Sequence, residues 1–138
     1  MPTVNGVIET ALYVADLDRA ARFYRELFGF RLLLSDDRLR ALSVAGRHVL
    51  LLFLRGASNQ PNPAPTGGII PAHDASGRTH VGFAISADQL DAWERQLTEH
   101  GVTIESRIIG PRGGTSLYFR DPDGHLLELL TPGIWPIY

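Results

Sequence analysis

Residues 116–130 of the chain read SLYFRDPDGHLLELL, a pattern typical of two strands joined by a tight turn. The four residues at 121–124, DPDG, suit a type I turn, because aspartate accepts hydrogen bonds at its first position, proline fixes φ at the second and glycine closes it. The strand after the turn, residues 126–130, is apolar on both faces except at Glu128, so we expect it to be buried on both sides.

Glu128 is the first candidate for a functional residue. A carboxylate in a strand of this kind loses its hydration, which costs roughly several kcal/mol unless it is protonated, paired with a cation or bound to a metal. A protonated or hydrogen-bonded structural carboxyl group is the simpler alternative, and what Glu128 contacts decides between the two.

The composition excludes several classes of function. A chain of 138 residues suits one domain or two small halves that share a core. The net charge of -2, without a basic run or a long apolar stretch, argues against nucleic-acid and membrane partners. The N-terminus lacks a leader-like pattern, which predicts a cytoplasmic protein. Cysteine and lysine are both absent, so thiolate ligands, thiol nucleophiles and Schiff-base chemistry are excluded.

The first half of the chain, about residues 5–55, is expected to form one strand, one helix and three strands. Residues 7–14 alternate, with Glu9 on the less apolar face, and the other face is expected to lie under a helix. Asp16 has the residue type of a helix cap and Gly29 that of a helix terminator. Further strands are predicted near residues 30–35, 39–44 and 48–54.

The second half, about residues 79–132, repeats this order after a Pro- and Gly-rich stretch at 56–78 that we expect to be a loop, acting as a linker or a lid. A strand at residues 80–85 places His80 on one face, and Ser86 with Gln89 predicts a capping box before a helix that ends at Gly101. Strands are predicted near residues 102–107, 115–119 and 126–130, before an apolar tail at 133–138.

The two halves form an internal repeat. Gly29 and Gly101 lie 72 positions apart, and Glu9 and His80 lie 71 positions apart. The repeat gives Glu9 and His80 equivalent places in two related sheets. If the sheets curl around a common cavity, Glu9, His80 and Glu128 all face inward, and one imidazole with two carboxylates suits the coordination of Mn(II), Fe(II), Ni(II), Co(II) or Zn(II). For His80 the alternative is a core histidine bonded to backbone.

Other side chains are candidates for contacts with a substrate. Tyr118 shares strand parity with Ser116, so its hydroxyl is expected to donate a hydrogen bond to a bound oxyanion, and we include it with Glu128 among the catalytic candidates. His73 in the long loop is a candidate acid or base, although a solvated histidine is the commoner case. His125 is expected to be turn structure. The tail with Trp135 is expected to pack on the cavity mouth or on a partner subunit.

Three segments together resemble the vicinal oxygen chelate superfamily: ETALYVADL at 9–17 with RFY at 22–24 and LFG at 27–29, HVGF at 80–83, and LYFRDPDGH at 117–125 followed by Glu128. This superfamily includes glyoxalase I, extradiol dioxygenases, methylmalonyl-CoA epimerases, fosfomycin-resistance transferases and bleomycin-resistance proteins. The resemblance covers nearly the whole chain.

The resemblance implies a single α+β domain over residues 1–138, in which two βαβββ modules form a cupped, partly open mixed β-barrel with the helices outside. It implies a divalent metal held at the positions of Glu9, His80 and Glu128, and a small substrate that chelates the metal through adjacent oxygens. It also implies a homodimer in which one site can combine residues of two subunits.

Two differences between this chain and other members of the superfamily narrow the range of possible reactions. Extradiol dioxygenases and fosfomycin transferases have histidine where Glu9 stands, which makes a ring-cleaving dioxygenase less favoured here. Glyoxalase I and the epimerases take a further ligand from the strand that matches residues 49–53, which are all apolar in this chain. The sequence therefore does not decide the class of reaction, which can be that of a lyase, an isomerase, a transferase or a dioxygenase. The alternative function is that of a metal-free drug-binding protein of the bleomycin-resistance type.

Overall fold

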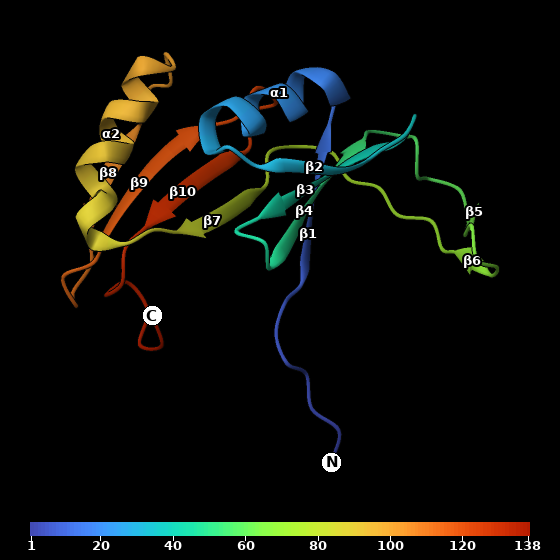
Figure 1. Cartoon of the computed structure of the whole chain (residues 1–138), viewed down its shortest axis with the longest axis horizontal. Coiled ribbons are helices and arrows are strands. Elements are labelled where there is room, and N and C mark those ends of the chain that lie inside the picture. The colour runs from blue at the N-terminus through green and yellow to red at the C-terminus, as the bar shows by residue number, and fades with distance from the viewer. The chain divides into compact units, whose positions relative to one another are not determined.

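The computed structural model describes all 138 residues, and it divides into two compact units, Met1–Ser76 and Gly77–Tyr138. Each unit contains one four-stranded mixed sheet and one main helix (Figure 1). The order strand, helix, three strands therefore occurs twice, and the predicted α+β fold of two βαβββ modules is confirmed.

In the first unit the strand order is β1-β4-β3-β2, with β1 parallel to β4 and the other neighbours antiparallel. The helix α1 follows β1 and carries the chain back toward the level at which β1 began. A crossover of this kind is needed before a later strand, here β4, can run parallel to β1. The elements are β1 (Glu9–Val14), α1 (Leu17–Phe28), β2 (Arg31–Ser35), β3 (Leu39–Val44) and β4 (His48–Leu54).

The helix α1 begins and ends where the sequence predicts. The side chain of Asp16 accepts a hydrogen bond from the Arg19 amide at 3.0 Å, and Gly29 adopts the left-handed conformation with φ of 71°. The helix buries one apolar stripe against one face of its sheet. The stripe consists of Leu17, Ala20, Ala21, Tyr24 and Leu27, and the sheet face beneath it includes Leu12, Val14, Leu42, Leu50 and Leu52.

The second unit repeats the connectivity with the strand order β7-β10-β9-β8, again with one parallel pair. On one face of this sheet the side chains are buried. They include Leu117, Phe119, Leu127 and Leu129. The elements are β7 (His80–Ala84), the short 3₁₀ helix η1 (Ala87–Gln89), α2 (Leu90–Glu99), β8 (Ser106–Ile109), β9 (Thr115–Arg120) and β10 (Leu126–Leu130).

The turn between β9 and β10 has the predicted form. The Gly124 amide donates to the Asp121 carbonyl at 3.0 Å, which closes a four-residue turn. The Asp121 side chain is buried, and its Oδ1 accepts from the amides of Asp123 and His125 at 2.9 Å each. These bonds fix the register of β10, and thereby the position of Glu128 opposite Tyr118.

Three local predictions need correction. The predicted capping box is wrong, because the Ser86 side chain makes no capping bond; the Gln89 amide donates to the Ser86 carbonyl in the tight 3₁₀ turn η1 instead. The strand predicted from residue 102 begins at Ser106, since the Val102 amide remains bonded to the Leu97 carbonyl at the end of α2. The loop at 56–78 contains a short hairpin, β5 (Asn62–Pro63) with β6 (Ile69–Ile70).

Neither helix has the length and the apolar composition that crossing a lipid bilayer requires.

Candidate functional site

A group of polar and ionisable side chains lies on the second sheet, on the face opposite to the one that carries Leu127 and Leu129. Glu128 on β10 stands beside Gly82 on the parallel neighbour β7 and beside Tyr118 on the antiparallel neighbour β9. Paired residues of neighbouring strands share a face. The register therefore brings predicted site residues from three strands together.

His80 and Glu128 form a close pair. The His80 Nε2 atom lies 3.2 Å from Glu128 Oε1, and the Glu128 side chain is only 9% exposed, whereas that of His80 is 49% exposed. His80 Nδ1 lies 2.8 Å from the Leu126 carbonyl oxygen, which can only accept a hydrogen bond. Nδ1 therefore carries a proton, and in the neutral ring the Nε2 lone pair faces the Glu128 carboxylate.

Two electron-rich atoms facing each other at this distance repel unless a cation lies between them. A proton satisfies the pair, and so does a divalent metal, for which a histidine with its other ring nitrogen bonded to a backbone carbonyl is the usual form of ligand. The donor set of one imidazole nitrogen and one carboxylate oxygen suits Mn(II), Fe(II), Ni(II), Co(II) or Zn(II). His80 and Glu128 thus fit the metal that the sequence predicts.

The second oxygen of Glu128 is held by neighbouring hydroxyl groups. Ser116 Oγ donates to Glu128 Oε2 at 2.5 Å. Burial and the charge of Glu128 raise the pKa of Tyr118, whose hydroxyl is also hydrogen-bonded to that carboxylate. Tyr118 accordingly remains a neutral phenol near pH 7, able to donate a hydrogen bond beside Glu128.

Gly82 leaves space next to the carboxylate. A Cβ atom at this position would lie 3.1 Å from Leu130 Cδ2 and 3.7 Å from Glu128 Oε1. A side chain here would therefore crowd Glu128 on the side that faces β7.

Glu9 opens β1 in the first unit and is exposed, on the sheet face opposite to the one that α1 covers. It is equivalent to His80, because each is the first residue of a strand that runs parallel to the last strand of its module. The position equivalent to Glu128 is Leu51, whose apolar side chain cannot bind a metal. No group of three or more histidine or acidic side chains is arranged to hold a metal.

The other histidines have structural partners. His73 Nδ1 lies 2.7 Å from the Tyr13 hydroxyl, and its ring packs edge-on against Phe53 with the ring centres 4.4 Å apart. His125 is buried, and its Nδ1 accepts from the Thr79 amide at 2.9 Å, in agreement with its predicted place in the turn. The bond to Tyr13 was not predicted, although Tyr13 has the strand parity of Glu9.

A family model described as "Glyoxalase/Bleomycin resistance protein/Dioxygenase superfamily" matches residues 6–129 of the chain. Among curated relatives, the metallothiol transferase FosB of Shouchella clausii is 32% identical over 131 residues, which are 93% of this chain and 81% of that protein. The FosB of Lysinibacillus sphaericus is 32% identical over 130 residues, covering 94% of this chain and 84% of that protein.

Among solved structures, the lactoylglutathione lyase from Agrobacterium tumefaciens superposes with a TM-score of 0.87 at 31% identity, covering 98% of this chain and 99% of that one. The fosfomycin resistance protein FosX from Listeria monocytogenes superposes with a TM-score of 0.70 at 22% identity, covering 94% of each chain, which is a likeness of fold alone.

Proposed function

Because the chain belongs to the glyoxalase/bleomycin resistance protein/dioxygenase superfamily, we propose that it is a divalent-metal-dependent enzyme acting on a small substrate with two adjacent oxygens. The observation that carries this proposal is the His80–Glu128 pair. The Nδ1 bond to the Leu126 carbonyl directs the Nε2 lone pair at a buried carboxylate, an arrangement ready to bind a cation.

Glu9 completes the proposed ligand set, from the same chain or from a second copy. Its place at the start of β1 is equivalent to that of His80 in β7, and it faces away from the helix of its module, as His80 and Glu128 face away from theirs. Three protein ligands leave two or three coordination positions for substrate oxygens.

The class of reaction we propose is group transfer to or from a small thiol. The name of the FosB relatives, metallothiol transferase, contains the word thiol, and the name of the lactoylglutathione lyase contains glutathione, which is a small thiol. This chain has no cysteine, so a thiol must come from a dissociable small molecule. A cytoplasmic location agrees with such a co-substrate and stays a prediction.

The residues of the second sheet then have defined roles. A bound divalent metal supplies Lewis-acid stabilisation of negative charge on a substrate oxygen. Tyr118 is kept protonated, and when the substrate binds its single hydroxyl proton turns from the Glu128 carboxylate to that oxygen, while Ser116 holds the carboxylate in place. Gly82 keeps the space beside Glu128 open.

The alternative is metal-free sequestration of a drug-like compound. It is less well supported, because the FosB relatives and the lactoylglutathione lyase carry the names of enzymes and because, without a metal, a proton would be the only cation between His80 and Glu128.

Metal analysis of protein purified without an affinity tag tests the proposal. We expect about one divalent ion per chain, lost on dialysis against a chelator and absent from His80→Gln. The matched control is His100→Gln, because His100 is an exposed histidine of the same unit whose Nδ1 bonds a backbone carbonyl but has no acidic partner. Equal metal content in the two variants would refute the ligand role of His80.

Activity is tested by offering small thiols, such as glutathione and cysteine, with substrates that carry two neighbouring oxygens. We expect metal-dependent loss of free thiol, measured with a thiol reagent, and a decrease of at least about tenfold for Tyr118→Phe, since one hydrogen bond to developing charge is lost. Thiol consumption that is unchanged by chelation would contradict the proposal.

A further inference from the structure

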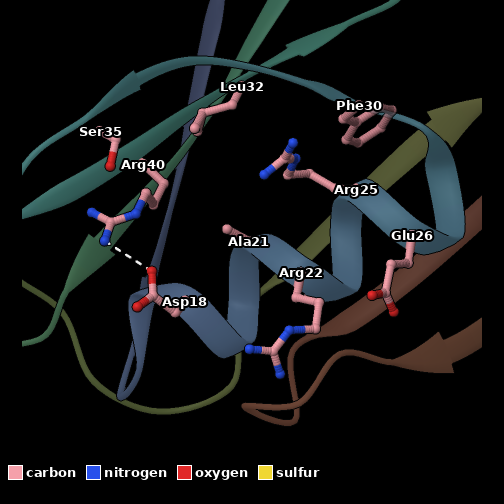
Figure 2. Close-up of a pocket in the computed structure, with 9 residues that line it drawn as sticks. All are labelled: Asp18, Ala21, Arg22, Arg25, Glu26, Phe30, Leu32, Ser35 and Arg40. Carbon is pink, nitrogen blue, oxygen red and sulfur yellow. Dashed lines mark hydrogen bonds and ion pairs between the residues drawn. The ribbon is translucent and has the colours of Figure 1, made fainter.

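A hollow lies in the first unit, on the face of the sheet opposite to Glu9, between the helix α1, the edge strand β2 and its neighbour β3 (Figure 2). Its volume is about 690 Å³, within the range that binds small organic molecules. None of its lining residues belongs to the proposed metal site. We call this hollow the α1 groove; its lining consists of Asp18, Ala21, Arg22, Arg25, Glu26, Phe30, Leu32, Ser35 and Arg40.

One wall of the α1 groove is apolar, and further aromatic rings pack behind it. Ala21, Phe30 and Leu32 present hydrocarbon surface to it. The Phe30 ring is stacked on Phe28 with the ring centres 4.9 Å apart, and Phe28 is in turn stacked on Tyr24, which is fully buried. The ring stack holds Phe30 in place, so a flat ligand meets a preformed surface.

Two arginines face this apolar wall from opposite sides. Figure 2 shows the Arg25 side chain reaching from α1 toward Leu32 and Phe30, and its guanidinium group has no hydrogen-bond or ion-pair partner. Arg40 is only 15% exposed and is held by the Asp18 carboxylate and the Leu39 carbonyl at 3.0 Å each.

The acidic residues of the α1 groove do not compensate Arg25. The Asp18 carboxylate is bonded to Arg40. Glu26 and Arg22 point away from Arg25 in Figure 2. One guanidinium group therefore stands uncompensated over an apolar floor, where desolvation by a ligand strengthens an ionic hydrogen bond.

The positive charge of the α1 groove does not follow from the internal repeat. The depression along the equivalent helix α2 is lined by Asp91, Glu94, Arg95, Thr98 and Glu99, three acids and a single arginine. The α1 groove has three arginines and two acids. The cationic, apolar-floored groove is thus a property of the first module alone.

We propose that the α1 groove binds a small aromatic carboxylate. The flat ring lies on Phe30 and Leu32, and the carboxylate accepts two hydrogen bonds from the planar guanidinium group of Arg25, with Arg40 adding positive potential. The lining shares no residue with the proposed metal site, so the ligand binds in the α1 groove without being the substrate of the proposed reaction. A partly open site with one such anchor is expected to bind with Kd on the order of 0.1–1 mM.

Two-dimensional NMR titration of the ¹⁵N-labelled chain with 1-naphthoate tests this. We expect the largest shifts at the amides of Ala21, Arg25 and Leu32, and about tenfold weaker binding of the neutral analogue 1-naphthalenemethanol. Arg25→Gln should weaken naphthoate binding about tenfold while leaving metal content and thiol consumption unchanged. Arg95→Gln, an arginine beside the acidic depression on α2, is the matched control and should have no effect.

Equal affinity for the acid and the alcohol would overturn the proposal, because the guanidinium group would then contribute nothing. Shifts that centre on other residues, or an Arg25→Gln variant that binds naphthoate like the wild-type protein, would overturn it as well. Since Arg25 is exposed, its replacement leaves folding intact, which a melting curve checks.

Discussion

At the scale of single residues, Glu128 is buried, and its proposed role as a metal ligand depends on its negative charge. In Glu128→Gln the amide can still accept the Ser116 hydrogen bond, so the metal-free protein should melt within about 2 °C of the wild-type protein. The stabilisation by added metal should disappear, because a neutral amide is a poor ligand. For the wild-type protein at 100 times Kd, that stabilisation is about 2.7 kcal/mol, or on the order of 5–10 °C in Tm.

Differential scanning fluorimetry with and without Mn(II) or Zn(II) measures both quantities. A variant that retains the full metal-induced shift would remove Glu128 from the ligand set. Glu105→Gln provides the comparison, since Glu105 is an exposed carboxylate of the same unit that is paired with Arg120 and faces no histidine.

Leu52 tests the core beneath α1. Its side chain is fully buried, so Leu52→Ala should lower the free energy of unfolding by about 3 kcal/mol through lost apolar burial and the cavity left behind. Leu33→Ala makes the same chemical change at a strand residue that is 48% exposed, and it should cost less than about 0.5 kcal/mol. Urea unfolding measures both; similar midpoints would contradict the packing described here.

At the scale of elements, the N-terminus of α1 is expected to depend on pH. The hydrogen bond from the Arg19 amide lowers the pKa of Asp16 from its ordinary value of 3.8, with further lowering by nearby Arg19 and Arg22. The folded state therefore favours the carboxylate. This contribution to stability is complete above the ordinary pKa and is lost as the pH falls through the lower folded-state pKa.

Asp16→Asn keeps a capping oxygen and removes the charge. Its melting temperature should be below that of the wild-type protein at pH 7, and the difference should shrink as the pH falls through the lowered folded-state pKa of Asp16 and vanish once that carboxyl group is protonated. Melting curves from pH 2 to pH 7 measure this. A difference that persists at the acid end would mean that the charge of Asp16 does not contribute.

The C-terminal tail is held by a close contact between two backbone segments. A Cβ atom on Gly114 would lie 2.6 Å from the Gly133 carbonyl carbon, so Gly114→Ala should destabilise the protein by roughly 1–3 kcal/mol. In Gly110→Ala the closest atom, at 3.0 Å, is the mobile end of the Ile134 side chain, and the effect should be smaller. Thermal unfolding compares the two, and equal effects would contradict the contact.

At the scale of the whole molecule, we predict a homodimer. Trp135 is 62% exposed and Ile137 is 96% exposed, although the Tyr138 hydroxyl anchors the tail on the carbonyls of Ile85 and Leu130. Apolar side chains presented in this way favour association. Analytical ultracentrifugation should give a mass of about twice 15.2 kDa.

The double variant Trp135→Ser with Ile137→Ser should shift the protein toward the monomer by at least about tenfold in Kd, because two apolar anchors are lost. Leu33→Ser, which changes an exposed leucine outside the tail, should leave the mass unchanged. A wild-type protein that sediments as a monomer at 50 μM would contradict the prediction of a dimer.

Much of the fold followed from local patterns. The strand patterns of residues 39–44, 48–54 and 126–130 predicted β3, β4 and β10 with their observed bounds, and the turn chemistry at Asp121 and Gly124 predicted the β9–β10 hairpin, in which β9 extends one residue beyond the predicted 115–119. The start of α2 was predicted less well, because a backbone bond in a 3₁₀ turn replaced the expected Ser86 cap. The side-chain oxygen and the carbonyl oxygen of Ser86 compete for the same Gln89 amide, and the sequence does not rank these two acceptors.

The sequence by itself determined the repeat, the strand faces and the residue types able to bind a metal, since these follow from periodicity and side-chain chemistry within a few positions. Only the tertiary structure decided that the Leu126 carbonyl fixes the His80 tautomer, that Ser116 and Tyr118 hold Glu128, and that Arg25 stands uncompensated over Phe30. Such contacts join residues up to 46 positions apart along the chain. Their geometry depends on strand register and packing, which no local pattern contains.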